Sequence, residues 1–164
     1  MPTNLYGPGD NFDLNNSHVL PALIRKAVEA KAGSAQQMVV WGTGTPRREL
    51  MHSDDLAEAC MFVMNLDEAT YGTLLREEVP PLLNIGTGVD LTIRELATLV
   101  ARIVGFEGHL VFDASKPDGT PQKLMDVSRL NKLGWQAKIG LEDGIRQACV
   151  AFTDSALSTP AHLR

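Results

Sequence analysis

The sequence is poor in clustered positive charge and in long apolar runs, and both absences exclude functions. Its 164 residues carry 15 lysines and arginines against 20 acidic residues, which gives a formal net charge of −5. No run of lysine or arginine is longer than two residues, so the broad basic surface that nucleic acid requires is not expected. No apolar run approaches the roughly 20 residues that cross a bilayer, and no basic segment followed by a hydrophobic one opens the chain. We therefore expect a soluble, cytoplasmic protein that binds neither nucleic acid nor membrane.

Cysteine and histidine are also scarce, which limits redox and metal chemistry. The two cysteines, Cys60 and Cys149, lie on helical patterns beside apolar residues, where a small buried thiol is the usual explanation. So few cysteines do not predict a disulfide framework. The four histidines are scattered, and no cluster of Cys, His, Asp and Glu has the spacing of metal ligands. We expect no metal site, and the missing G-x-S-x-G motif gives no indication of a serine hydrolase.

The glycine fingerprint of dinucleotide-binding proteins is missing too. The turn Gly42-Thr43-Gly44 has Arg47 where the third glycine of G-x-G-x-x-G should stand, and Gly86-Thr87-Gly88 has Leu91 there. The second turn precedes a predicted helix, so it could bind an anion at the helix N-terminus. Its glycines could equally serve only the tight connection of a strand to a helix.

Hydrophobic periodicity predicts one α/β domain in which short strands and helices alternate. Thr92 and Glu95 form a capping box, which makes the helix that follows them the clearest in the chain. Strands are expected at residues 38–41, 50–52, 82–85 and 109–113, and helices at 19–28, from Ser53 to Met64, from Thr92 to Ile103, at 128–133 and from Leu141 to Phe152. Residues 71–81 are expected to form a polar turn. We expect the domain to span residues 1–155 and residues 156–164 to form a frayed tail.

The stretch from Trp41 to Glu49 carries the most specific chemical signal. A strand end, a glycine-rich turn and the pair Arg47-Arg48 suit a phosphorylated ligand, because guanidinium groups offer paired donors to phosphate oxygens. The indole of Trp41 adds an apolar plate on which a sugar or a base could rest. A surface hairpin with two solvated arginines and a core tryptophan explains the same residues.

Two further segments carry candidate polar groups. His18 follows loops rich in asparagine, and imidazole suits acid–base chemistry near neutral pH, although a lone histidine at a helix start often only caps the helix or faces solvent. In the loop from Lys116 to Lys123, Asp118 and Lys123 could hold polar groups of a ligand. A simple turn followed by a solvated lysine is the alternative there.

These motifs occur in the same order as in the GDP-L-fucose synthase family of the extended short-chain dehydrogenases/reductases, which the chain resembles over nearly its whole length. The resemblance rests on residues 2–8, 17–23, 40–49, 84–88 and 112–121. It implies an NADPH-dependent conversion of GDP-4-keto-6-deoxy-D-mannose to GDP-L-fucose, by epimerisation at C3 and C5 and reduction at C4. It also implies a homodimer when the protein is full length.

The resemblance assigns roles residue by residue. His18 matches the histidine acid of the epimerisation, which also lies near the nicotinamide, and Pro2, Thr3, Asn4 and Leu5 match the loop along the nicotinamide half of NADP. Trp41 matches the aromatic residue beside the substrate, and Arg48 matches the arginine that meets the diphosphate. Asp118 and Lys123 match contacts to the nucleoside end. Lys26 is a departure, because relatives often have arginine there, and an ammonium lacks the two-point fork of a guanidinium.

The chain also lacks parts of the family pattern. Beyond the glycine fingerprint, no Tyr-x-x-x-Lys pair is present, since Tyr6 is followed four residues later by Asp10 and Tyr71 by Leu75. The chain therefore resembles the C-terminal half only, comprising the edge of a parallel Rossmann-type sheet and a small mixed α/β substrate-binding lobe, and these residues alone are not expected to catalyse the reaction. A UDP- or dTDP-sugar epimerase or dehydratase, and a non-enzymatic binding module, remain alternatives.

Overall fold

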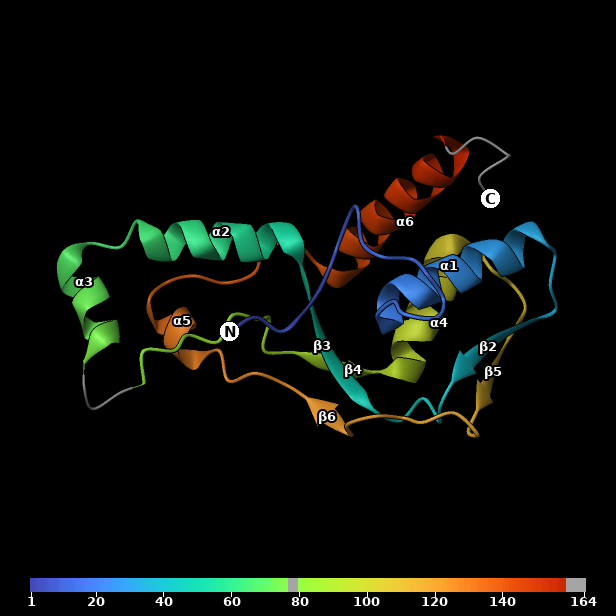
Figure 1. The fold of residues 1–164 in the computed structure, drawn as a ribbon, viewed down its shortest axis with the longest axis horizontal. Helices are drawn as coiled ribbons and strands as arrows, with labels where there is room; N and C mark the ends of the chain where they lie inside the picture. The colour runs from blue at the N-terminus through green and yellow to red at the C-terminus, as the bar shows by residue number, and fades with distance from the viewer. Residues whose placement is uncertain (77–79, 159–164) are drawn as a thin grey trace.

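The computed structural model describes residues 1–76 and 80–158, with side chains as far as Ser155 in the second range. The molecule is elongated (Figure 1), with the strand β3 (Arg47–His52) running between two groups of elements. One group contains the helices α1 (Val19–Ala32), α4 (Ile93–Val104) and α6 (Leu141–Ser158) together with the strands β2 (Gln37–Trp41) and β5 (His109–Asp113). The other contains α2 (Ser53–Met64), α3 (Glu68–Gly72), the 3₁₀ turn η1 (Thr73–Leu75) and α5 (Ser128–Lys132).

The strand β3 organises a mixed sheet. Its second half pairs in parallel with β1 (Asn4–Tyr6), and its first half pairs with two short strands. These are β4 (Asp90–Thr92), which is antiparallel to β3, and β6 (Gln122–Lys123), which is parallel to it. A single parallel bridge joins Pro2 to Ile85 beyond the start of β1. This arrangement agrees with the predicted sheet edge and mixed lobe.

The strands β2 and β5 form a separate parallel pair. Alternation along β2 buries Met38 and Val40 against the helices and leaves Gln37, Val39 and Trp41 exposed, as expected of a strand that covers a core with one face. Trp41 is 52% exposed, so the core tryptophan that one interpretation of the sequence allowed is excluded. The indole therefore lies on the outer surface at the strand's end.

The apolar side chains form two clusters on either side of β3. The larger one packs α1, α4 and α6 together through fully buried side chains, among them Leu20, Ile24, Leu96 and Ile145. The smaller one lies under α2 and α5 and contains Met51, Ala59, Ile85, Leu130 and Trp135. Helical spacing located the helix residues of the larger cluster correctly, whereas the smaller cluster also draws on β3 and on loop residues that no helical pattern marks.

The helix ends follow local rules in some places and tertiary contacts in others. The capping box is confirmed at α4, where the Thr92 hydroxyl accepts from the Glu95 N–H and the Glu95 carboxylate accepts from the Thr92 N–H. For α2 the predicted range, Ser53–Met64, is confirmed, and the residue that caps it is His52. The Nδ1 atom of His52 accepts from the Asp54 N–H at 3.2 Å. Asp54 and Asp55 occupy the first turn, where their charges are favourable.

Three other predictions need correction. Residues 82–85 form no strand, and only Ile85 makes a bridge. The segment expected as a turn, residues 71–81, contains the end of α3 and the whole of η1, while residues 77–79 lie outside the described residues. Helix α6 runs to Ser158, past the predicted start of the tail, and residues 159–164 lie outside the described part of the chain.

The two cysteines differ from each other. Cys60 is exposed on α2, contrary to the prediction of a buried thiol, whereas Cys149 on α6 is half-buried. Burial raises the pKa of the Cys149 thiol to about 11. Cys149 is therefore a neutral thiol near pH 7.

Candidate functional site

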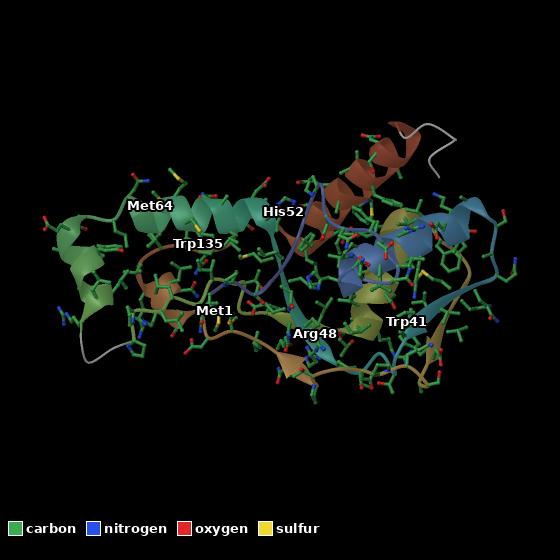
Figure 2. The ribbon with its side chains drawn as sticks, viewed as in Figure 1. Met1, Trp41, Arg48, His52, Met64 and Trp135 are labelled. Carbon is green, nitrogen blue, oxygen red and sulfur yellow. The ribbon has the colours of Figure 1, made fainter. Side chains whose placement is uncertain are left out.

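A cavity of about 250 Å³ lies where the N-terminal part of α1, the ends of β2 and β3 and the loop before β6 meet. Its inner wall is apolar and includes Leu23, Val40 and Ile93. Its rim is polar and contains four residues that the resemblance assigns to substrate binding, namely Lys26, Trp41, Arg48 and Asp118. Figure 2 labels Trp41 at the end of β2 and Arg48 at the start of β3, with His52 at the other end of β3. The fold therefore brings together side chains that are widely separated in the sequence.

The glycine turn after β2 takes its shape from Asp118. Gly42 and Gly44 have φ values of 83° and 79°, a region that L side chains rarely adopt. A Cβ atom on Gly42 would collide with the Asp118 carboxylate, and one on Gly44 would collide with the Phe112 ring. Asp118 Oδ1 accepts from the Thr43 N–H at 2.7 Å, and Oδ2 accepts from the Thr43 hydroxyl at 2.8 Å. The turn is thus closed by protein groups, and its amides do not form an open anion cradle.

Lys26 reaches the same rim from α1. Its Nζ atom lies 4.9 Å from the centroid of the Trp41 ring and donates to the Val39 carbonyl at 3.1 Å. Burial lowers the pKa of Lys26, because partial desolvation disfavours the ammonium form. The lysine is held against the indole and has no carboxylate within 4.0 Å in the described part of the chain.

The two adjacent arginines have different roles, because they point away from each other along β3. Arg47 forms an ion pair with Asp90, with 2.8 Å between Nε and Oδ1, and its Nη2 donates to the Asp90 carbonyl. Arg48 instead lines the cavity, and its Nη1 donates to the carbonyl oxygens of Arg47 and Thr120 at 2.7 and 2.6 Å. Both lie in β3, which begins directly after the glycine turn and earlier than the predicted strand start at Leu50. Only Arg48 is available to an anionic ligand.

His18 and Lys123 lie near the cavity but do not line it. His18 is the N-cap of α1; its side chain is exposed and makes no capping hydrogen bond, while its neighbours Ser17 and Val19 both line the cavity. Lys123 is exposed on β6 in register with Arg48. Of the residues that the resemblance places around the substrate, Trp41, Arg48 and Asp118 line one cavity, whereas His18 does not.

The predicted cofactor loop lies along β3, apart from the cavity lining. Pro2 bridges to Ile85, and Leu5 pairs with Met51. The Thr3 hydroxyl and the Asn4 amide both donate to the Glu49 carbonyl, at 3.3 and 2.7 Å. The side-chain donors of this loop thus fix its position on the sheet.

Glu49 is an organising residue that the sequence did not single out. It is 0% exposed, and its Oε1 and Oε2 atoms accept from the N–H groups of Gly88 and Met125 at 2.7 and 2.9 Å. A Cβ atom on Gly86 would collide with this carboxylate. The second glycine turn therefore surrounds an acid of the protein itself, so an anion site at this turn, which the sequence left open, is not supported. This role depends on the burial of the Glu49 carboxylate beside the segments that pack on β3, and the sequence alone does not show that burial.

Ser17 is a second residue of the cavity that its sequence context does not mark as functional. It lines the cavity, and its buried hydroxyl has no hydrogen-bonding partner among the described residues. The position of this hydroxyl depends on how the loop before α1 folds against β2. No local sequence signal distinguishes it from an ordinary helix-start serine.

Among the described residues, Tyr6 is uncharged, and neither a metal site nor a membrane-spanning helix is found. Burial, with smaller contributions from Asp55 and Asp143, raises the pKa of Tyr6, so its phenol is neutral. Within residues 1–76 and 80–158, no three histidine, cysteine or acidic side chains come together as metal ligands. No helix in these ranges combines the length and apolar character of a membrane span.

Comparison with known proteins defines the class first. Residues 1–75 match the model of the NAD dependent epimerase/dehydratase family, and the α/β architecture agrees with solved members. Over these residues the chain is similar to this family. It spans about half the length of the curated relatives that it matches.

The particular relatives are GDP-L-fucose synthases. The chain is 56% identical over 158 residues to the GDP-L-fucose synthase of Escherichia coli K12, covering 94% of this chain and 48% of that protein. It is 57% identical over 147 residues to GDP-L-fucose synthase 1 of Arabidopsis thaliana, covering 90% of this chain and 42% of that protein. A GDP-L-fucose synthetase from Naegleria fowleri has a TM-score of 0.81 at 28% identity, covering 96% of this chain and 46% of that one. These shares are consistent with the expected C-terminal half.

Proposed function

We propose that the cavity beside Trp41 binds a GDP-sugar. The observation that supports this most is the pairing of Arg48 with Lys26 on the rim. Both are cations that have no carboxylate within ion-pair distance in the described residues, although the chain as a whole is acidic. A diphosphate supplies the missing negative charge, and the exposed indole offers a face to the base or the sugar. Asp118 orders the turn between them.

We further propose that the chain is the nucleotide-sugar-binding half of an enzyme that converts GDP-4-keto-6-deoxy-D-mannose to GDP-L-fucose. The C4 ketone of that substrate acidifies the C–H bonds at C3 and C5, so a base can remove each proton and an acid can return it on the other face. His18 is the proposed acid. It begins the helix whose first turns line the cavity, and its exposed imidazole makes no capping bond that would have to break.

The residues present suit only one end of the proposed NADPH. A structural neighbour, the Naegleria fowleri GDP-L-fucose synthetase at 27% identity and a TM-score of 0.80, is described as bound to NADP. When bound, the cofactor supplies the hydride for the ketone. The loop of Pro2, Thr3, Asn4 and Leu5 is proposed to contact its nicotinamide half, held in place through the Glu49 carbonyl. Both glycine turns are closed by Asp118 and Glu49, so neither turn is proposed to hold the cofactor's phosphates.

The binding proposal can be tested with GDP and GDP-mannose by isothermal titration calorimetry. Arg48→Ala should weaken GDP binding by about tenfold or more, as expected when a charge-assisted hydrogen bond to phosphate is lost. Arg102→Ala is the matched control, since Arg102 lies on α4 and forms an ion pair with Glu142. Equal affinities in the Arg48 variant and the wild type would contradict the proposal.

A related nucleotide preference is the alternative outcome. The loop of residues 116–123 is proposed to face the nucleotide base, so competition between GDP and UDP separates a GDP-sugar enzyme from a UDP- or dTDP-sugar enzyme. The high identity to GDP-L-fucose synthases favours GDP. A preference for UDP of tenfold or more would replace the substrate assignment but keep the family.

A further inference from the structure

The indole of Trp41 is approached by a second ammonium group, which the sequence did not assign to the site. Lys116 Nζ lies 5.5 Å from the centroid of the Trp41 ring, close to the 4.9 Å of Lys26. Two cations thus share one exposed aromatic ring at the mouth of the cavity. Such a contact at an exposed site is weak, so it does not by itself explain why both side chains gather there.

The main chain around Lys116 is held by hydrogen bonds, whereas its side chain is exposed. Asp113 pairs with Trp41 in the parallel register, and the Asp113 carbonyl accepts from the N–H groups of Gly42 and Lys116 at 2.9 and 3.1 Å. The next two residues, Pro117 and Asp118, line the cavity. Lys116 therefore begins the cavity wall at a defined position, with its exposed side chain extending over Trp41.

The charge of Lys116 has no close counter-ion. No carboxylate lies within 4.0 Å of its Nζ atom among residues 1–76 and 80–158. The acid it influences is Asp113, whose pKa is lowered mainly by hydrogen bonds from Ser115 and also by the charge of Lys116. Because Ser115 occupies Asp113 Oδ1 through both its N–H and its hydroxyl, that carboxylate is already engaged locally.

We propose that Lys116 is a third cation of the phosphate-binding site, which rests on Trp41 when no ligand is present and turns to the ligand's diphosphate when one binds. The proposal rests on the GDP-sugar function proposed above. A charge-assisted hydrogen bond to phosphate is stronger than an exposed cation–π contact, so the exchange is favourable. The exchange also frees the Trp41 ring to contact the bound nucleotide or sugar.

Titration of GDP into Lys116→Ala, Lys116→Arg and the wild type tests the proposal. Lys116→Ala should raise the Kd by about 5- to 20-fold and lower the dependence of affinity on salt concentration, because one fewer cation meets the phosphates. Lys116→Arg should keep most of the affinity. Lys132→Ala, which removes an exposed lysine on α5, is the matched control.

The outcomes separate this inference from the function on which it rests. If wild-type protein fails to bind GDP, both fall together. If Arg48→Ala weakens binding while Lys116→Ala matches the wild type in affinity and salt dependence, the GDP-sugar site stands and the role of Lys116 is overturned. Tighter binding by Lys116→Ala would also overturn it, because the lysine would then compete with the ligand for Trp41.

Discussion

Asp118 binds both polar hydrogens of Thr43, although the two residues are 75 positions apart in the chain. This contact joins the loop before β6 to the glycine turn after β2, and both segments carry residues that line the cavity. The carboxylate therefore fixes the distance between Trp41 and the opposite wall. Asp118 can serve a ligand only with lone pairs that Thr43 leaves free.

Asp118→Ala should lower both stability and ligand affinity. The Thr43 N–H and hydroxyl would lose their partners, and we expect a loss of about 1–3 kcal/mol in the free energy of unfolding, measured by urea denaturation. GDP affinity should fall as well, because the turn that carries Trp41 is no longer fixed. The stability and the GDP affinity of Asp118→Asn should lie between those of the wild type and of Asp118→Ala, since the amide oxygen of asparagine still accepts from the Thr43 N–H. Unchanged stability in the alanine variant would show that water replaces the carboxylate at no cost.

His52→Ala should destabilise the protein more than an ordinary surface substitution. His52 is fully buried, caps α2 through Nδ1 and contacts the Tyr6 ring edge-on with the centroids 5.5 Å apart. Losing the cap and leaving a cavity should cost about 2–4 kcal/mol in the free energy of unfolding, measured by thermal and urea denaturation.

His52→Asn separates the two contributions. The asparagine oxygen can still accept from the Asp54 N–H, so this variant should lose the packing but retain the cap. If His52→Asn and His52→Ala are equally destabilised, the capping bond makes no contribution and packing alone accounts for the effect.

Asp90 should make the stability depend on pH in the acid range. Hydrogen bonds from Gln122 and Arg47 lower its pKa from the ordinary value of 3.8. Its contribution is therefore fully present above that unfolded value and is lost as the pH falls through the lower folded value. Stability measured by urea denaturation between pH 6 and pH 2.5 should decline less steeply in Asp90→Asn than in the wild type. Parallel curves for the two proteins would show that this pair adds nothing.

The apolar groove between α2, η1 and residues 81–85 should bind hydrophobic dye. It encloses about 450 Å³, and Met64, which is 76% exposed, and Leu82 lie on its rim. Exposed apolar patches of this kind promote association. Dye fluorescence and light scattering should therefore both be higher for the wild type than for a variant in which the patch is charged. The double variant Met64→Lys, Leu82→Lys should reduce both signals, whereas Val150→Lys on α6 should leave them unchanged.

Local signals predicted those elements whose stabilising contacts are themselves local. The capping box placed the start of α4 correctly, and alternation placed β2, because both patterns depend on neighbours in the chain. Strand β3 was predicted only from Leu50 onward, because Arg47, Arg48 and Glu49 do not look like strand residues. Their partners are distant in sequence: Arg47 pairs with Asp90, Arg48 donates to the Thr120 carbonyl, and Glu49 accepts from the N–H groups of Gly88 and Met125.

The same distinction applies to the candidate site. Trp41, Arg48 and Asp118 were selected from their chemistry and from the family resemblance, and Lys26 from the resemblance alone; the fold brings all four to one cavity. Lys116 and Ser17 were not selected, because their interest lies in what they approach or lack: an indole from another strand and a missing partner for a buried hydroxyl. Such properties arise only when the segments pack together.

Glu49 links the loop proposed to meet the nicotinamide to the strand that carries Arg48. Its carbonyl holds Thr3 and Asn4, its carboxylate holds Gly88 and Met125, and the residue before it is Arg48. The main chain under the guanidinium is thus anchored before any ligand arrives. Ligand binding then has to immobilise a side chain but not a backbone segment, which keeps the entropic cost of binding low. The same anchor ties the position of the ligand's phosphates to that of the loop proposed to meet the nicotinamide.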